Sequence, residues 1–104
     1  IVVLVTCPSR AVARRIATAL VTKRLAACVN VLPGVESTFR WQGKIDRSRE
    51  ILLLIKTTRR RFSSLAQALV RLHPYDVPEV IVLPVVDGSP PYLSWVRRSV
   101  SRPC

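Results

Sequence analysis

Most of the side chains that could do chemistry in this chain lie in one eight-residue segment, His-Pro-Tyr-Asp-Val-Pro-Glu-Val at positions 73–80. The segment brings together an imidazole, a phenol and two carboxylates, and it holds the only histidine of the chain. Its two prolines fix their own φ and favour extended backbone at the residue before each, so we expect a stiff loop that displays these groups. A well-capped connection from a helix to a strand would explain the same residues without any chemistry.

His73 is the first candidate metal ligand, because neutral imidazole is the commonest ligand of transition metals in proteins. With a carboxylate such as Asp76 or Glu79 it would form a modest Cu(II) site. Cys7 is the second candidate, since a thiolate suits Cu(I). Both residues also have structural explanations. His73 could end a helix with its ring bonded to backbone carbonyls, and Cys7 could be a small buried apolar side chain.

The three cysteines, Cys7, Cys28 and Cys104, form an odd set without CxxC or CxxH spacing. This pattern argues against a disulfide framework and a structural zinc site, and it fits a reducing cytoplasm. We expect Cys28 to be a core residue of a strand and Cys104 to be exposed. The sequence begins inside an apolar run without a basic leader, which predicts that it holds no signal peptide.

The chain carries 17 Lys and Arg against 6 Asp and Glu, a formal charge of +11. Such a charge can mark a nucleic-acid or phosphate partner, but the cations are spread along the whole chain, which favours a solvated basic surface. Three consecutive cations, Arg59, Arg60 and Arg61, fall in the first turn of a predicted helix. They oppose the positive end of the helix dipole at a cost of about 0.3–1 kcal/mol each. Either salt screens them or an anion is held there.

The length of 104 residues predicts a single domain over residues 1–104. Apolar residues make up 49% of the chain and the mean hydropathy is +0.27, which is high for a small domain that must cover its own apolar surface. No apolar run approaches the ~20 residues that a membrane span requires. We therefore expect a soluble protein, part of whose apolar surface is covered by a partner.

Hydrophobic periodicity and turn residues predict the elements that position these groups. Strands are expected at residues 1–6, 26–32, 35–41, 44–56 and 80–86, with a break at Pro33-Gly34 and a hairpin turn at Gln42-Gly43-Lys44. Helices are expected from about 12 to 25 after a Ser9 cap, from a Thr58 cap to Pro74, and at about 92–100.

The order of these elements is βαββαβ plus a C-terminal helix, which is the split βαβ pattern of an α+β, ferredoxin-like sandwich with an antiparallel sheet. In that fold both helices cover one face of the sheet, so strands whose other face met water would alternate apolar and polar residues. Residues 1–5 and 51–55 are instead apolar at every position. The second face should therefore be covered as well, and another copy of the chain is the expected cover.

Five stretches, in this order and at this spacing, resemble the CutA divalent-cation tolerance family over almost the whole chain. They are KRLAACVNVLPGV at 23–35, WQGKI at 41–45, LIKTT at 54–58, HPYDVPEV at 73–80 and YLSW at 92–95. The resemblance implies a ferredoxin-like fold and a compact homotrimer whose sheets pack together. It also implies kinship in architecture with trimeric PII-type signalling proteins. The Arg59-Arg60-Arg61 run is a departure from the family pattern.

The resemblance also bears on site residues. Members of the family are linked to tolerance of copper and other divalent metals, and some relatives have metal-binding thiols near the position of Cys7 or a second histidine where this chain has Leu72. Positions around the clefts between subunits are polar or aromatic in the family. The matching residues here are Asn30, Trp41, Lys56, Tyr75 and Glu79. They would bind a small ligand or ion, or they would hold the trimer together.

The sequence thus predicts a cytoplasmic, non-enzymatic homotrimer that binds or responds to divalent metal ions such as copper. One alternative is a PII-like regulator that binds a small molecule in the inter-subunit clefts. A second is a basic nucleic-acid-binding module, since RNA-binding domains share the split βαβ order. Such modules carry aromatics on their central strands, and residues 1–5 and 51–55 have none, so binding to nucleic acid should be non-specific. Catalysis is poorly supported because no nucleophile has an evident base.

Overall fold

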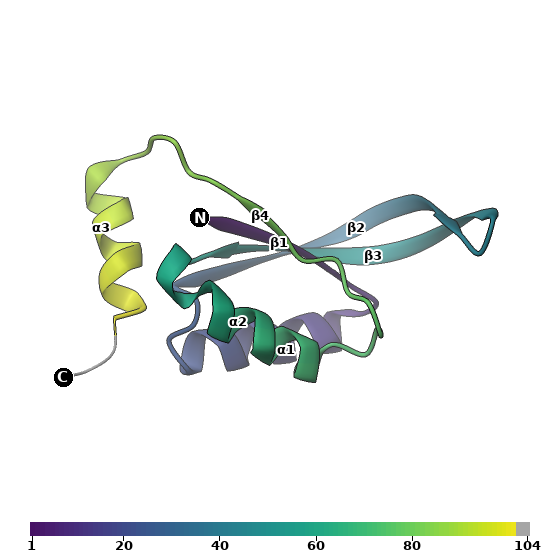
Figure 1. The fold of residues 1–104 in the computed structure, drawn as a ribbon, viewed down its shortest axis with the longest axis horizontal. Helices are drawn as coiled ribbons and strands as arrows, with labels where there is room; N and C mark the ends of the chain where they lie inside the picture. Colours follow the sequence, from purple (N-terminus) through teal and green to yellow (C-terminus); the bar gives the residue numbers. More distant parts are fainter. Residues whose placement is uncertain (102–104) are drawn as a thin grey trace.

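The computed structural model describes residues 1–101. It contains a four-stranded antiparallel sheet in the order β2-β3-β1-β4, and three helices (Figure 1). Along the chain the elements are β1 (Val2–Cys7), α1 (Arg10–Thr22), β2 (Cys28–Trp41), β3 (Lys44–Lys56), α2 (Arg59–Leu72), β4 (Ile81–Leu83) and α3 (Pro90–Ser99). This order and topology confirm the predicted ferredoxin-like α+β fold.

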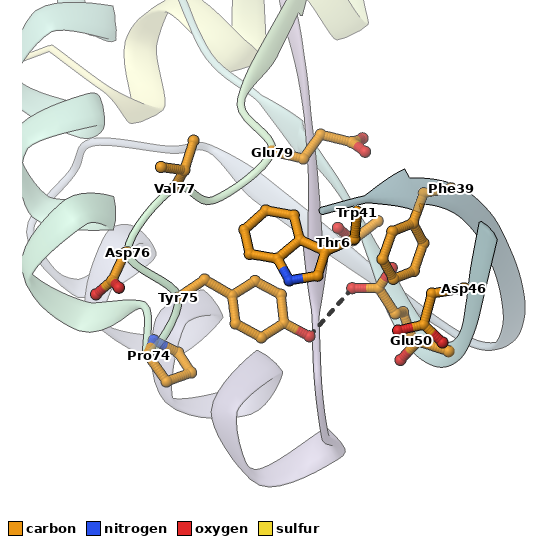
Figure 2. Close-up of a pocket in the computed structure, with 11 residues that line it drawn as sticks. Thr6, Phe39, Trp41, Asp46, Glu50, Pro74, Tyr75, Asp76, Val77 and Glu79 are labelled. Carbon is orange, nitrogen blue, oxygen red and sulfur yellow. Dashed lines mark hydrogen bonds between the residues drawn. The ribbon is translucent and has the colours of Figure 1, made fainter. Parts of the chain in front are cut away.

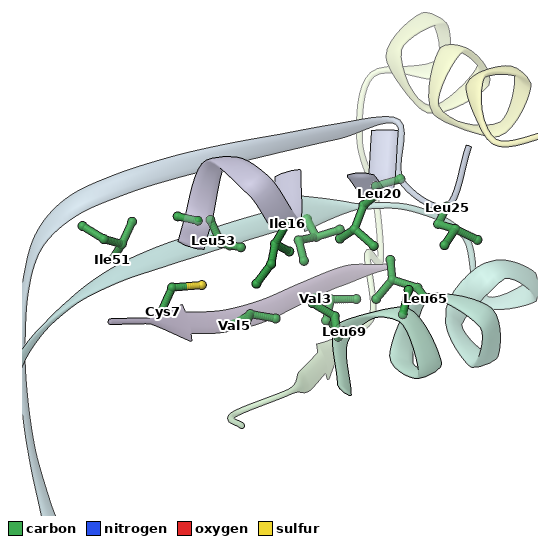
Figure 3. Close-up of a cluster of buried hydrophobic side chains, with 14 residues drawn as sticks. Val3, Val5, Cys7, Ile16, Leu20, Leu25, Ile51, Leu53, Leu65 and Leu69 are labelled. Carbon is green, nitrogen blue, oxygen red and sulfur yellow. The ribbon is translucent and has the colours of Figure 1, made fainter. Parts of the chain in front are cut away.

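The core lies between one face of the sheet and helices α1 and α2, which cover the same face (Figure 1). Alternate residues of the central strands point into it, as the two-residue period of a strand requires. The fully buried side chains include Val3 and Val5 of β1, Leu53 of β3, Ile16 of α1 and Leu69 of α2 (Figure 3). Burying each such side chain contributes about 1.5–3 kcal/mol, so this layer holds the domain together.

The opposite face of the sheet is also apolar. Leu4 of β1 pairs with Leu54 of β3 on one side and with Ile81 of β4 on the other, so these three side chains share that face. Leu4 and Leu54 are only partly buried, and Ile81 is 48% exposed. The expectation that the central strands are apolar on both faces is therefore confirmed. The helices α1 and α2 cover only one of the two faces.

Strands β2 and β3 continue beyond the body of the domain as a long hairpin (Figure 1). The expected turn is present, with Gln42 and Gly43 both at positive φ, as a tight hairpin requires. The expected break at Pro33-Gly34 is wrong: β2 is one strand with a bulge between Leu32 and Val35. The bulge accommodates a proline that lacks an N–H and a glycine at φ +81°, so the chain bends without leaving the sheet.

Other boundaries differ from the sequence prediction by a few residues. Strand β4 ends at Leu83 instead of residue 86, because Pro84 cannot donate to the ladder. Helix α3 begins at Pro90 instead of residue 92, since proline suits the first turn of a helix. Helix α1 is capped as expected, with the Ser9 hydroxyl accepting from the Val12 N–H at 3.2 Å. It ends at Thr22, and β2 starts only at Cys28.

Thr58 takes the N-cap position of α2, but its side chain makes no capping hydrogen bond. The predicted position of the N-cap is therefore confirmed, whereas the expected hydrogen bond from its side chain is not formed. None of the helices in residues 1–101 is long and apolar enough to cross a membrane.

Candidate functional site

The segment that begins at His73 is fixed to the sheet by the histidine ring. His73 ends helix α2 and is only 6% exposed. Its Nδ1 accepts a hydrogen bond from the Tyr75 backbone N–H at 3.2 Å, so its Nε2 carries the proton and donates to the Thr6 carbonyl at 2.7 Å. Both ring nitrogens are thus engaged within the chain, as in the structural explanation considered from the sequence. A metal bound to this ring would have to displace one of these bonds, and the ligand role of His73 stays a prediction.

Cys7, the second predicted metal ligand, lies at the end of β1 and is fully buried. Burial, and next the negative charge of Glu50, raise the pKa of the Cys7 thiol to about 11. The thiol is therefore protonated at neutral pH, whereas a metal ligand must be a thiolate. Cys28 is partly buried and lies on the sheet face away from the helices, opposite Lys56, so it is not a core residue. The prediction for Cys104 lies outside the described residues.

A pocket of about 580 Å³ opens between the segment after α2 and the projecting part of the β2–β3 hairpin (Figure 2). We call it the acidic pocket. Its lining residues are Thr6, Phe39, Trp41, Asp46, Ser48, Glu50, Pro74, Tyr75, Asp76, Val77 and Glu79. Three of the five predicted cleft residues, Trp41, Tyr75 and Glu79, thus meet here although they are far apart in the sequence. The other two, Asn30 and Lys56, do not.

Asn30 is exposed on the sheet face that α1 and α2 leave open, paired with Leu54. Lys56 lines a separate pocket near helix α3. Within one chain the five residues therefore do not form a single site. Whether neighbouring subunits bring them together in one cleft stays a prediction.

Sequence reasoning missed three charged or aromatic residues of the acidic pocket, Phe39, Asp46 and Glu50, and Glu50 is the most buried of them. It is only 8% exposed, and its Oε2 accepts a hydrogen bond from the Tyr75 hydroxyl at 3.3 Å (Figure 2). Burial raises the pKa of the Tyr75 phenol, and the charge and hydrogen bond of Glu50 raise it further, so the phenol stays protonated as a donor. One signal was available in the sequence. Glu50 stands directly before the apolar run 51–55, where a carboxylate is out of place unless it has a partner.

The acidic pocket concentrates the few negative charges of a strongly basic chain. Of the six acidic residues in the sequence, four line it: Asp46, Glu50, Asp76 and Glu79. None of its lining residues is Lys or Arg. Clustered carboxylates in a concave site attract cations. Yet no three His, Cys, Asp or Glu side chains in residues 1–101 are close enough together to hold one metal ion. Carboxylate oxygens are suitable ligands for a divalent cation. In residues 1–101, however, too few of them lie close together to surround one ion.

The comparisons with known proteins agree on one family. The family model described as CutA1 divalent ion tolerance protein matches residues 1–99. The chain is 52% identical over 98 residues to the "Divalent-cation tolerance protein CutA" of Thermus thermophilus, covering 94% of this chain and 95% of that protein. It is 50% identical to the mouse "Protein CutA" over 90% of this chain. The matched region spans only 53% of the mouse protein.

Solved structures show the same fold. The chain superposes on the divalent cation tolerance protein of Thermus thermophilus with a TM-score of 0.93, over 94% of this chain and 95% of that one, at 52% identity. It superposes on CutA from Xylella fastidiosa with a TM-score of 0.94, over 96% of each chain, at 45% identity.

Proposed function

The chain belongs to the CutA1 divalent ion tolerance family, and we propose that it binds divalent metal ions at the acidic pocket as a non-enzymatic homotrimer. The observation that carries the proposal is the gathering of four of the six acidic side chains around one pocket that no lysine or arginine lines. In a chain of charge +11 this is the place where a cation is attracted instead of repelled.

The kind of metal binding follows from the geometry. A single chain offers scattered carboxylates instead of an enclosed set of donors. One or two carboxylates suffice for a divalent ion that keeps part of its water shell. The proposed site therefore holds a hydrated ion weakly, which suits a protein that responds to changes in metal concentration. Copper at His73 or Cys7, predicted from the sequence, would require the ring to give up its hydrogen bond to Tyr75 or Thr6, or the thiol to lose its proton.

The trimer is proposed from the open apolar face of the sheet and from the hairpin. Trp41 is 59% exposed near the hairpin end, and Ile45 beside it is equally exposed. Exposed apolar groups of this size on a projecting hairpin are typical of a surface that packs against another subunit. A neighbouring chain in this position would also bring further side chains to the acidic pocket, which Trp41 lines.

The same proposal includes a non-enzymatic role and a cytoplasmic location. The only imidazole is engaged at both nitrogens, so no evident base is free to activate a nucleophile. Cys7 and Cys28 are free thiols, which supports a reducing compartment.

The test is a titration of Mn²⁺ and Cu²⁺ into the protein by isothermal calorimetry. Glu50→Gln and Glu79→Gln remove a pocket charge while keeping the shape of the side chain. Glu36→Gln and Asp87→Asn are the matched controls, since these two acids lie outside the acidic pocket. We expect weaker binding in the two pocket variants and unchanged binding in the controls. Equal affinity in all five proteins would reject the acidic pocket as the metal site.

One observation favours the PII-like alternative at the same place. Phe39, Trp41 and Tyr75 supply aromatic surface to the acidic pocket, and aromatic rings among carboxylates suit a small organic ligand with a positive charge. In that case Trp41→Ala would abolish binding of the organic ligand and leave the affinity for metal ions intact.

A further inference from the structure

A second charged pocket lies at the other end of the domain, between the first turn of α2 and the last turn of α3. Its volume is about 740 Å³. Three arginines line it, Arg60, Arg61 and Arg97, together with the hydroxyl residues Thr58, Ser64 and Ser101. We call it the arginine pocket. None of the described residues that line it is acidic. No carboxylate among these residues therefore neutralises the positive charge of the arginines.

Arg61 is the member that a solvated basic surface does not explain. Its side chain is only 9% exposed, and its Nε donates a hydrogen bond to the Val100 carbonyl at 2.8 Å. That bond fixes the guanidinium between α2 and the end of α3. The two terminal nitrogens of Arg61 make no hydrogen bond to residues 1–101, and no unpaired side-chain nitrogen is fully enclosed there, so they face the pocket. A guanidinium that is fixed in place by one hydrogen bond and keeps two nitrogens open to the pocket is preorganised to bind an anion.

The start of α2 adds to the same preference. Its first turn carries three arginines and no acid, and the side chain of Thr58 does not cap the helix. The backbone N–H of Arg61 already donates to the Thr58 carbonyl at 3.1 Å, but the positive end of the dipole still attracts an anion. The guanidinium groups of Arg60 and Arg97, both exposed, can then close on that anion with charge-assisted hydrogen bonds. Without an anion, the same residues repel one another and the helix end.

We propose that the arginine pocket binds the phosphate chain of a small polyphosphate ligand, either a free polyphosphate or a nucleoside di- or triphosphate. Three guanidinium groups match two or three phosphate groups better than one, and Arg is the residue best shaped to bind phosphate oxygens in pairs. The pocket is larger than a single phosphate needs. This site goes beyond the proposed metal function and shares no residue with the acidic pocket.

The surface beside the arginine pocket distinguishes the two possible ligands, a free polyphosphate and a nucleotide. A neighbouring pocket of about 470 Å³ shares Thr58 and Arg97 with the arginine pocket and adds the side chains of Tyr92 and Leu93. It offers an aromatic and apolar wall directly beside the cationic site. The organic part of a nucleotide would lie against this wall, whereas a free polyphosphate would leave it empty.

The test is calorimetric titration of inorganic tripolyphosphate and of ATP in metal-free buffer at low salt. The variants are Arg60→Gln and Arg97→Gln, both exposed and therefore harmless to folding. The control is Arg40→Gln, which removes the same charge from the exposed hairpin strand β2. We expect each pocket variant to bind tripolyphosphate about tenfold more weakly, the effect of losing one charged hydrogen bond. Arg40→Gln should retain the affinity of the unmodified protein.

Tighter binding of ATP than of tripolyphosphate, lost in Tyr92→Ala, would identify a nucleotide as the ligand. Equal binding would identify the phosphate chain itself. An equal loss in all three arginine variants would overturn the proposal in favour of a diffuse basic surface. Binding of an RNA oligonucleotide without any binding of tripolyphosphate or ATP would overturn it as well. Glu50→Gln should bind tripolyphosphate normally, so failure of the metal proposal and failure of this one are distinguishable.

Discussion

The hydroxyl of Tyr75 donates a hydrogen bond to Oε2 of Glu50 at 3.3 Å, which joins the segment after α2 to strand β3 at the base of the hairpin. The two residues are 25 positions apart in the sequence. The same tyrosine also packs against the ring of His73, with ring centroids 4.7 Å apart. Tyr75 is therefore the link between the buried histidine and the carboxylates of the acidic pocket.

Tyr75→Phe should lower the free energy of unfolding by about 1 kcal/mol, because it leaves the mostly buried Glu50 carboxylate without its donor. Urea denaturation measures this change. Tyr92→Phe is the control, since it removes the same hydroxyl from an exposed side chain. An equal loss of stability in both variants would mean that the Tyr75–Glu50 bond contributes nothing.

The raised pKa of Tyr75 gives that bond a pH dependence. A group with a raised pKa in the folded protein stabilises the fold below its unfolded pKa, here about 10, and loses this contribution as the pH rises through the folded value. We therefore expect the stability of the unmodified protein to fall more steeply above pH 10 than that of Tyr75→Phe. Thermal melts across that range measure the difference, and parallel curves would contradict the pKa shift.

Cys7 should be inert toward alkylating reagents in the native protein. Its pKa of about 11 and its complete burial leave almost no accessible thiolate at pH 8. A protein with Cys28→Ser and Cys104→Ser isolates this thiol. We expect iodoacetamide to label it only after unfolding. Rapid labelling of the folded protein would instead show an accessible thiolate, and would support the metal role that the sequence predicted for Cys7.

The order of elements could be predicted because each strand and helix carries its own periodicity. Pro33 and Gly34 could not be read correctly, since the same two residue types end a strand or form a bulge, and only the pairing partner on β3 decides which. The segment 73–80 was recognisable from its residue types. Its contact with Glu50 was not, because a hydrogen bond across 25 positions leaves no local pattern. The structure likewise shows a buried His73 ring whose partner, the Thr6 carbonyl, is 67 positions away.

Replacing His73 separates its structural role from its predicted metal role. His73→Ala removes the donor to Thr6 and the acceptor for Tyr75, so we expect unfolding to become easier by about 1–3 kcal/mol. The affinity for Mn²⁺ at the acidic pocket should change little if the variant is measured well below its melting temperature. A specific loss of Cu²⁺ binding in His73→Ala, with Mn²⁺ binding retained, would support the imidazole ligand predicted from the sequence.

The apolar face of the sheet leads to the last prediction, which concerns assembly. Leu4, Leu54 and Ile81 form a continuous apolar surface on the side that α1 and α2 leave open, and a second copy of the chain would bury it. For the trimer that the family resemblance implies, light scattering coupled to size exclusion should give three times the 11.7 kDa chain mass. Leu54→Lys should reduce that mass, because the lysine would place a charge in the interface. Arg14→Gln, on the exposed side of α1, should leave it unchanged. A stable monomer of the unmodified protein at micromolar concentration would overturn the trimer, and the apolar face would then need another partner.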